Sequence, residues 1–246
     1  MTLRIAWAAA LACALVASAE SAASTTSKPS PPSWILRGAY APTIDPANFV
    51  ATVDNEYFPL KPGARFHFEG MSDGTPQTDD VLVTHKTKLV LGVKCTVVRD
   101  TVSENGKAVE RTFDWYAQDK QGNVWYMGEN SLELKNGRLV RADDSWEGGV
   151  NGGKPGIIMR GHPRPGEVYR QEYYRPGGAL DQARVVGTTA TVRVPDGSSK
   201  RALVTVEWSP VEPQLEQKFY APGIGEIEEQ VIRGGHERFR LVAVTH

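Results

Sequence analysis

Four side chains between residues 162 and 173 carry groups that could perform acid–base chemistry. His162 and Arg164 belong to a glycine-rich segment, and Glu172 and Tyr173 follow on an alternating stretch. His162 or Glu172 would act as general base, and Arg164 or Tyr173 would stabilise developing negative charge. A hydrolase, lyase or isomerase is therefore one hypothesis. A flexible loop followed by a solvated strand face explains the same residues.

A second group of candidate residues flanks the turn in FDWYAQDKQGNVWYMGEN, residues 113–130. A three-residue loop ending at Gly122, with this glycine in the left-handed conformation, would place Tyr116 opposite Tyr126. The Asn-Gly pair at 105–106 predicts another tight turn, which joins this hairpin to the strand before it. Because side chains alternate between the faces of a strand, the pairing assigns each residue to a face.

The predicted pairing gives two faces of different chemistry. One face would hold Thr96, Val98, Phe113, Trp115, Trp125, Met127 and Glu129. The other would hold Cys95, Val97, Arg99, Asp114, Tyr116, Val124 and Tyr126. The first set is typical of packed core. The second combines tyrosines with an arginine and an aspartate, which is typical of a cavity wall.

Arg99, Asp114, Tyr116 and Tyr126 are therefore the candidate ligand-binding residues. They favour a binding protein for a small amphipathic or apolar ligand. A purely structural role stays open, because cross-strand tyrosine pairs and ion pairs ordinarily stabilise sheets. A register error of one residue would also exchange the faces. An envelope interaction protein without a pocket is a further alternative.

The sequence shows no signature of a metal or cofactor site. The five histidines are scattered, without a short-spaced pair or a cysteine partner. There is no Gly-x-Ser-x-Gly elbow, no Walker loop and no dinucleotide-binding glycine pattern. We therefore expect neither a metal nor a cofactor, and a small molecule is the expected partner.

The first 23 residues have the three regions of a secretory signal peptide. Arg4 supplies a positive charge, residues 5–16 form an apolar run too short to span a bilayer, and Ala-Ser-Ala at 17–19 is a cleavage site. The protein is therefore predicted to be secreted or periplasmic, with no transmembrane segment after cleavage. Lipid anchoring through Cys13 is disfavoured, because the usual leucine three residues upstream is missing.

Composition limits the classes of partner. The chain of 246 residues has a formal charge of −1, which gives no reason to expect nucleic acid or a strongly acidic partner. Cleavage would remove Cys13 and leave Cys95 alone, so no disulfide could form within the mature chain. The pattern around Cys95 predicts a buried strand residue. Oligomeric state is not predicted.

A succession of short strands must position these groups. About ten to twelve alternating runs are separated by Gly, Asn and Asp turns, and no segment shows sustained helical periodicity, which predicts an antiparallel all-β fold. Asp45 and the proline after it predict one short helical turn. Residues 24–44 are expected to form a disordered Ser/Pro-rich linker and an irregular lead-in to a single domain, 45–246. The glycine-rich loop 148–165 would divide two sub-sheets or act as a lid.

Two parts of the sequence resemble known proteins. Residues 54–63, DNEYFPLKPG, and residues 114–126, DWYAQDKQGNVWY, are similar to a family of secreted bacterial proteins with no assigned function. Residues 219–227, FYAPGIGEI, resemble a terminal hairpin of periplasmic proteins with strongly curved antiparallel sheets, including relatives of the lipoprotein carriers. This resemblance implies a strongly curved sheet, or an open or half barrel, that could wrap an apolar ligand. It transfers no catalytic residue.

Overall fold

The computed structural model describes residues 31–246 and confirms an all-β fold. The predicted signal peptide, residues 1–23, lies outside the described residues. The predicted helical turn is present as a 3-10 helix, η1 (Pro46–Asn48), whose N-cap Asp45 accepts a hydrogen bond from the Ala47 backbone N–H at 3.0 Å. Within the described part of the chain, no helix is long and apolar enough to cross a membrane.

The strands of the described residues are β1 (Asp54–Asn55), β2 (Phe58–Pro59), β3 (Arg65–Ser72), β4 (Thr75–Val90), β5 (Val93–Glu104), β6 (Lys107–Gln118), β7 (Val124–Lys135), β8 (Arg138–Arg141), β9 (Trp146–Glu147), β10 (Lys154–Met159), β11 (Val168–Arg170), β12 (Glu172–Tyr173), β13 (Gln182–Val194), β14 (Gly197–Trp208), β15 (Leu215–Ala221), β16 (Gly225–Arg233) and β17 (Glu237–Thr245).

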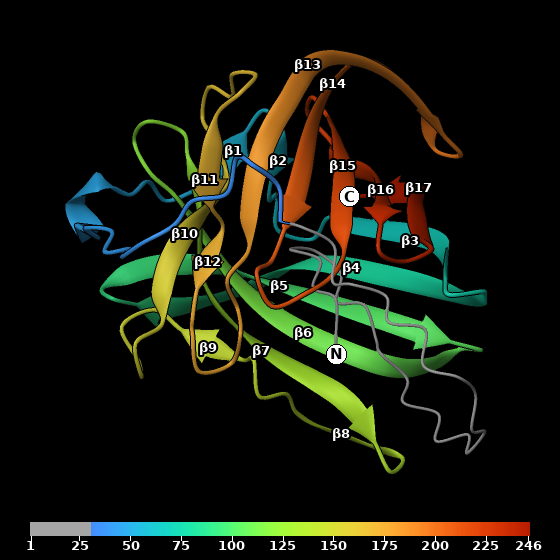
Figure 1. Ribbon diagram of the computed structural model, residues 1–246, viewed down its shortest axis with the longest axis horizontal. Coiled ribbons are helices and arrows are strands. Elements are labelled where there is room, and N and C mark those ends of the chain that lie inside the picture. The colour runs from blue at the N-terminus through green and yellow to red at the C-terminus, as the bar shows by residue number, and fades with distance from the viewer. Residues whose placement is uncertain (1–30) are drawn as a thin grey trace.

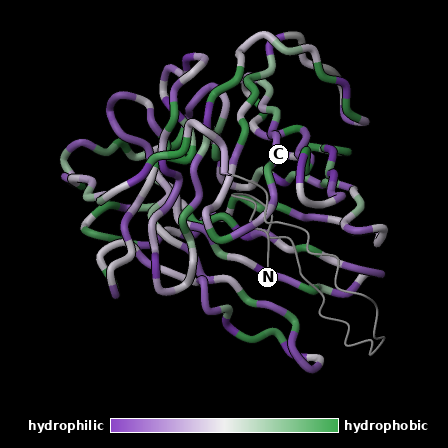
Figure 2. Tube along the Cα trace, viewed as in Figure 1, coloured by the Kyte–Doolittle hydropathy of each residue, from purple (hydrophilic) through white to green (hydrophobic). Residues whose placement is uncertain are grey.

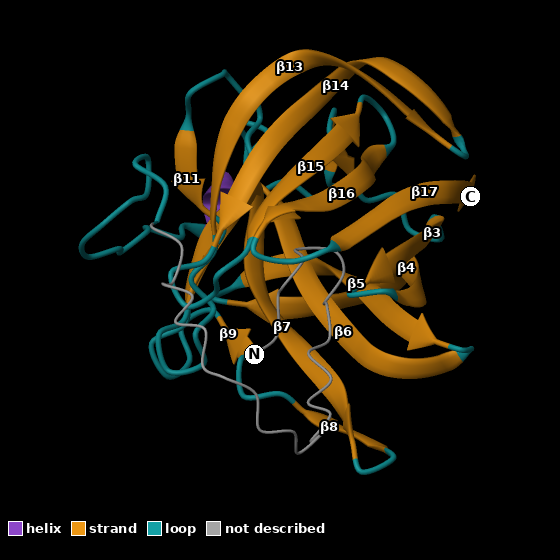
Figure 3. Ribbon diagram, turned by 45° about the vertical axis from the view of Figure 1, so that its right-hand side comes forward, coloured by secondary structure: helices purple, strands orange, loops and turns teal. Residues whose placement is uncertain are grey.

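Fifteen of these strands form one antiparallel sheet, and β1 and β2 form a small separate one. The path runs β11-β13-β14-β15-β16-β17-β3-β4-β5-β6-β7-β10-β12, with β8 and β9 also paired to β7. Figure 1 shows β4 to β7 crossing the lower part of the molecule and β13 to β15 rising above them. Figure 3 shows how strongly the strands bend, as the predicted curved sheet requires.

The two ends of the large sheet belong to one short stretch of chain. β11 pairs with β13, and β12 pairs with β10, yet Gln171 alone separates β11 from β12. Gly156 of β10 packs directly on this junction, because a Cβ atom there would lie 2.4 Å from the Gln171 carbonyl carbon and oxygen. The curvature of the sheet therefore brings its terminal strands together.

Both predicted turns of the central strands are confirmed. The strands flanking residues 105–106 pair in the predicted register next to that turn. Tyr116 pairs with Tyr126 as predicted, and Gly122 has the left-handed conformation, with φ of 82°. The turns therefore fix the register in their immediate neighbourhood.

Because of a β-bulge in β6, part of β5 faces the opposite way from the prediction. Val109 is the extra residue, because the register shifts between Val102 and Ser103. Beyond the bulge, Arg99 pairs with Phe113, and the neighbour of Arg99 pairs with Asp114. The predicted placement of Arg99 on the Asp114 face is therefore wrong, and the adjoining part of β5 changes face with it.

Because of a second bulge, in β7, Glu129 lies on the opposite face from the predicted one. The register between β6 and β7 shifts so that Trp115 pairs with Gly128 and Asp114 pairs with Glu129. Gly128 has φ of 138°, and a Cβ atom there would lie 2.6 Å from the Trp146 carbonyl oxygen. Glu129 was predicted to share a face with Trp115, but it lies on the Asp114 face.

Hydrophobic side chains pack on both faces of the central strands. Trp115 is buried on one face of these strands, which we call the outer face. This confirms the prediction that the Trp115 face is packed core. The larger inner cluster contains Phe58 of β2 together with residues from both halves of the large sheet, including Phe66, Val98, Tyr116, Tyr126, Leu203 and Tyr220. Figure 2 shows the hydrophobic segments dispersed along the trace among hydrophilic ones. Buried polar residues, such as Asp114 and Thr205, lie on the same strands as the residues of this cluster.

Candidate functional site

Many acidic side chains are buried, although carboxylates are almost never fully buried without compensation. Several of them lie on strands that face the inner cluster. They are Asp79, Asp100, Glu110, Asp114, Glu129, Glu207, Glu216, Glu226, Glu229 and Glu237. Each buried carboxyl group needs a proton, a cation or hydrogen-bond donors.

Lys218 lies among four of these carboxyl groups with a fully buried side chain. The distance from its Nζ atom is 3.3 Å to Glu229 Oε2, 3.4 Å to Glu207 Oε2 and 3.9 Å to Glu216 Oε2. Glu226 also acts on it electrostatically. One ammonium group therefore faces four carboxyl groups, and it can balance a single negative charge.

Glu207 receives the most donors of this group. Its Oε1 atom accepts hydrogen bonds from Thr205 Oγ1 at 2.7 Å and from the Tyr220 hydroxyl at 3.3 Å. Its Oε2 atom accepts one from Gln171 Nε2 at 2.9 Å. Gln171 is the residue at which the two ends of the sheet meet, so the sheet junction and the acidic group are connected.

Burial also acts on the pKa values of the other residues around Lys218 and of Lys218 itself. It raises the pKa of Glu216 and of Glu229 well above the ordinary value, and Lys218 opposes the shift while neighbouring carboxyl groups add to it. Burial likewise raises the pKa of Glu226 to about 8. Burial acts to lower the pKa of Lys218, but the surrounding glutamates outweigh it and the pKa is raised. Burial therefore favours the protonated form of these carboxyl groups, and the surrounding glutamates favour the charged form of the lysine.

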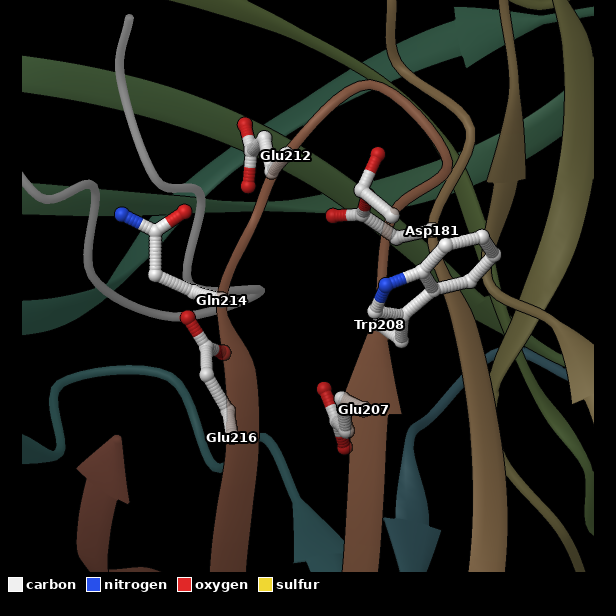
Figure 4. Close-up of a pocket in the computed structure, with 7 residues that line it drawn as sticks. Asp181, Glu207, Trp208, Glu212, Gln214 and Glu216 are labelled. Carbon is white, nitrogen blue, oxygen red and sulfur yellow. The ribbon is translucent and has the colours of Figure 1, made fainter. Parts of the chain in front are cut away.

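A small cavity of about 10 Å³ lies where β14 ends and β15 begins. Figure 4 shows Glu207 and Glu216 on neighbouring strands and Glu212 and Gln214 on the loop between them. The cavity is lined by Asp181, Glu207, Trp208, Ser209, Glu212, Gln214 and Glu216. Its volume matches about one water-sized group. We call this the acidic cavity.

Glu207 and Glu216 are directly opposite each other in the β14–β15 pairing. They are only 5% and 4% exposed. Like charges directly opposite one another destabilise a sheet, and burial strengthens their repulsion. A proton or a cation between the two strands removes that cost.

Three polar atoms of the acidic cavity lack hydrogen-bond partners. Glu216 Oε1, Gln214 Oε1 and Ser209 Oγ are buried and find no partner among the residues that the structure describes. Glutamate and glutamine Oε1 atoms accept hydrogen bonds, and a hydroxyl can both accept and donate. The cavity is therefore suited to a group that donates several hydrogen bonds.

Three of the four predicted ligand-binding residues come together, but in the buried interior. Tyr116 and Tyr126 are 0% and 4% exposed, and their rings stack with centroids 4.9 Å apart. The Tyr126 hydroxyl lies 2.6 Å from Asp114 Oδ1 and 2.9 Å from Glu129 Oε2. The tyrosine pair and the two carboxyl groups therefore form one buried polar cluster.

Arg99, the fourth predicted ligand-binding residue, lines a different cavity. This cavity of about 210 Å³ is also lined by Arg65, His67 and Asp80. The distance from His67 Nδ1 to Asp80 Oδ1 is 2.8 Å. The Asp80 carboxylate thus offsets part of the positive charge there.

The four candidate catalytic residues lie in different surroundings. His162 and Arg164 are exposed on the loop after β10. Glu172 is buried, and its Oε2 atom accepts a hydrogen bond from Trp146 Nε1 at 2.7 Å. Tyr173, next to it on β12, is half-buried and lines a third cavity. On β12, the side chain of Glu172 therefore lies in the interior, and that of Tyr173 lies at a cavity.

The sequence patterns did not single out Glu207, Glu216 or Lys218. Glutamate and lysine at alternate positions of a strand are typical of a solvated face. Tyr220 was one available signal. It follows Glu216 and Lys218 at every second position of one strand, so an inward-facing Tyr220 would place both polar residues on the packed face as well. As for metals, no group of three or more His, Cys, Asp or Glu side chains in the described part of the chain could hold an ion.

Fold and site together define an all-β protein with an acidic interior. No family model matches the chain, and no curated protein matches it. A candidate exported protein with a YmcC-like fold from Bacteroides fragilis is 14% identical, with a TM-score of 0.47, and a candidate lipoprotein from Parabacteroides distasonis is 10% identical, with a TM-score of 0.42. Each alignment covers 78% of this chain and 100% of the other. No function is transferred from either structure.

Proposed function

We propose that the protein is a secreted or periplasmic binding protein for a small amphipathic molecule that carries an amine. The observation that supports this most is the set of partnerless atoms in the acidic cavity, Glu216 Oε1, Gln214 Oε1 and Ser209 Oγ. A protonated primary amine has three hydrogen-bond donors and no acceptor. It complements these atoms in number and in charge.

The charges around the cavity favour a cation over a neutral donor. Lys218 can balance one of the carboxyl groups that surround it, and Glu207 and Glu216 are opposed in the sheet. An ammonium group bound between them would offset the second negative charge, which Lys218 alone does not balance. Buried charges are tolerated in proteins when they are paired in this way.

The acidic cavity is too small for more than the amine group, so the rest of the ligand would lie at the surface. A volume of about 10 Å³ accommodates the amine group alone. At the same loop, the half-buried Trp208 ring and Val211, which is 40% exposed, offer apolar area for a short hydrocarbon body. The ligand would thus be amphipathic, with its cationic end inward.

Calorimetric titration with hexylamine tests the proposal, and hexanol serves as the neutral analogue. We expect hexylamine to bind and hexanol to bind much more weakly. Glu216→Gln keeps the shape of the side chain and removes its charge, so it should weaken hexylamine binding about tenfold, or about 1.4 kcal/mol. Glu69→Gln changes an exposed glutamate on β3 and is the matched control.

The pH dependence gives a second readout. Because burial raises the pKa of Glu216, hexylamine affinity should increase as the pH rises and this carboxyl group ionises. The increase should be reduced in Glu216→Gln. Equal binding of hexylamine and hexanol would favour a purely apolar ligand, and an unchanged affinity in Glu216→Gln would refute the proposed site.

A further inference from the structure

A separate cavity of about 340 Å³ lies beside the lead-in segment, residues 31–44. It is lined by Gly38, Ala39, Tyr40, Lys154, Tyr173 and Arg175. In Figure 1 the lead-in is the blue segment that passes β10 and β11. The volume is within the range of small-molecule sites, about 300–1,000 Å³. We call this the basic cavity.

Hydrogen bonds between the lead-in and the sheet hold one wall of the basic cavity. The Tyr40 hydroxyl donates to the Pro155 carbonyl oxygen at 2.9 Å, and Lys154 Nζ donates to the Tyr40 carbonyl oxygen. Arg170 Nη2 donates to the Leu36 carbonyl oxygen at 3.0 Å. The wall is therefore preformed, although this segment belongs to no strand.

Two aromatic rings of the basic cavity are fixed by a buried arginine. The Tyr40 and Tyr173 ring centroids are 5.7 Å apart. The Arg170 guanidinium lies 5.6 Å from the Tyr40 ring centroid and 5.2 Å from that of Tyr173. Cation–π contacts of this kind orient the rings. Arg170 is thus a positioning residue behind the cavity.

The two charged side chains that line the basic cavity, Lys154 and Arg175, are both positive. No acidic side chain is among its lining residues. Lys154 Nζ lies 5.2 Å from the Tyr173 ring centroid, and a single carbonyl contact leaves further donors on its ammonium group. Arg175 is exposed and lines the same cavity. This composition is opposite to that of the acidic cavity.

We infer that the basic cavity is a binding site for a small ring compound bearing one carboxylate or phosphate group. Lys154 and Arg175 would pair with the anion, and the guanidinium of Arg175 offers the fork of donors that suits either group. The rings of Tyr40 and Tyr173 would contact the ring of the ligand. The basic cavity shares no lining residue with the acidic cavity, so the two sites are independent of each other.

Titration of the full mature protein with benzoate, phenyl phosphate and benzyl alcohol tests this site. We expect saturable binding of at least one of the two anions, and the stronger of them identifies the preferred group. Benzyl alcohol should bind about tenfold more weakly. Arg175→Gln should lower the anion affinity by a similar factor, whereas Arg164→Gln, at an exposed arginine outside the cavity, should not.

Variants of Tyr173 test the aromatic wall. Tyr173→Phe keeps the ring and should bind like the unaltered protein, and Tyr173→Leu should bind more weakly. Circular dichroism of each variant verifies that it is folded. No saturable binding of either anion at millimolar concentration would overturn the inference. So would equal losses in Arg175→Gln and Arg164→Gln.

Discussion

At the scale of single residues, Lys218 shows how one charge organises a buried acidic group. Its ammonium contacts carboxyl groups on β14, β15 and β16, so three adjacent strands share one cation. Removing that cation would leave buried carboxylates without compensation, which is costly in a protein interior. The lysine therefore supports the arrangement of carboxyl groups from which the acidic cavity is built.

Cys95 gives a prediction that belongs to the same scale. It is fully buried, as its sequence pattern predicts, and burial raises the pKa of its thiol to about 12. Thiolates react and thiols do not. In the folded mature protein, Cys95 should fail to react with an aromatic disulfide reagent, and it should react fully in concentrated urea, as measured by the absorbance of the released thiol.

The neighbouring strand position supplies the matched control for Cys95. Lys94 is exposed, so Lys94→Cys in a Cys95→Ser background should react promptly without denaturant. Rapid reaction of Cys95 in the folded protein would contradict its burial.

At the scale of elements, the junction between β10 and residues 168–173 depends on Gly156. A Cβ atom there would lie 2.4 Å from the Gln171 carbonyl group and 2.6 Å from the Arg170 carbonyl oxygen. These are backbone atoms, so Gly156→Ala must push the two segments apart. We expect a loss of about 1–3 kcal/mol in the free energy of unfolding, measured by urea denaturation.

Gly187 in β13 is the control for this substitution. A Cβ atom at Gly187 would meet nothing within 4 Å, and alanine restricts the unfolded chain more than glycine does. Gly187→Ala should therefore leave the stability nearly unchanged or raise it slightly. Similar losses in the two variants would show that the β10 junction is not specially crowded.

The same scale shows what the sequence could and could not predict. Turn residues gave the central hairpins, since Asn-Gly and Gly122 have local conformational preferences that sequence reveals. The bulge at Val109 has no such signal, and it reversed the face of Arg99. The bulge at Met127 did have one, because the next residue is Gly128 and a glycine inside a strand often marks a bulge. An extra residue is a property of the pair of strands, which single-strand patterns do not report.

At the scale of the whole molecule, antiparallel strands were predictable and the acidic interior was not. Side chains alternate between the two faces of β15, so Glu216, Lys218 and Tyr220 share one face and their neighbours share the other. The alternation does not reveal which of these faces points inward. Curvature decides this, since it turns one face of the sheet upon itself and brings β11 beside β13 and β12 beside β10. Such long-range closure depends on contacts between residues that are distant in sequence.

Buried carboxyl groups distributed over the sheet predict how stability depends on pH. Burial raises the pKa of Asp79 to about 7, of Glu226 to about 8 and of Glu237 to about 7. In the unfolded chain these groups have ordinary values near 4. Between those limits the folded state binds more protons, so the free energy of unfolding must fall as the pH rises.

Thermal unfolding should therefore occur at a higher temperature at about pH 5 than at about pH 9, with most of the loss between the unfolded and folded pKa values. Glu226→Gln imitates the protonated carboxyl group, so it should reduce this dependence and stabilise the protein on the alkaline side. Glu69→Gln, at an exposed side chain, should do neither. If stability instead increased with pH across this interval, the buried carboxyl groups would have to be ionised in the folded protein, and a cation other than Lys218 would have to balance them.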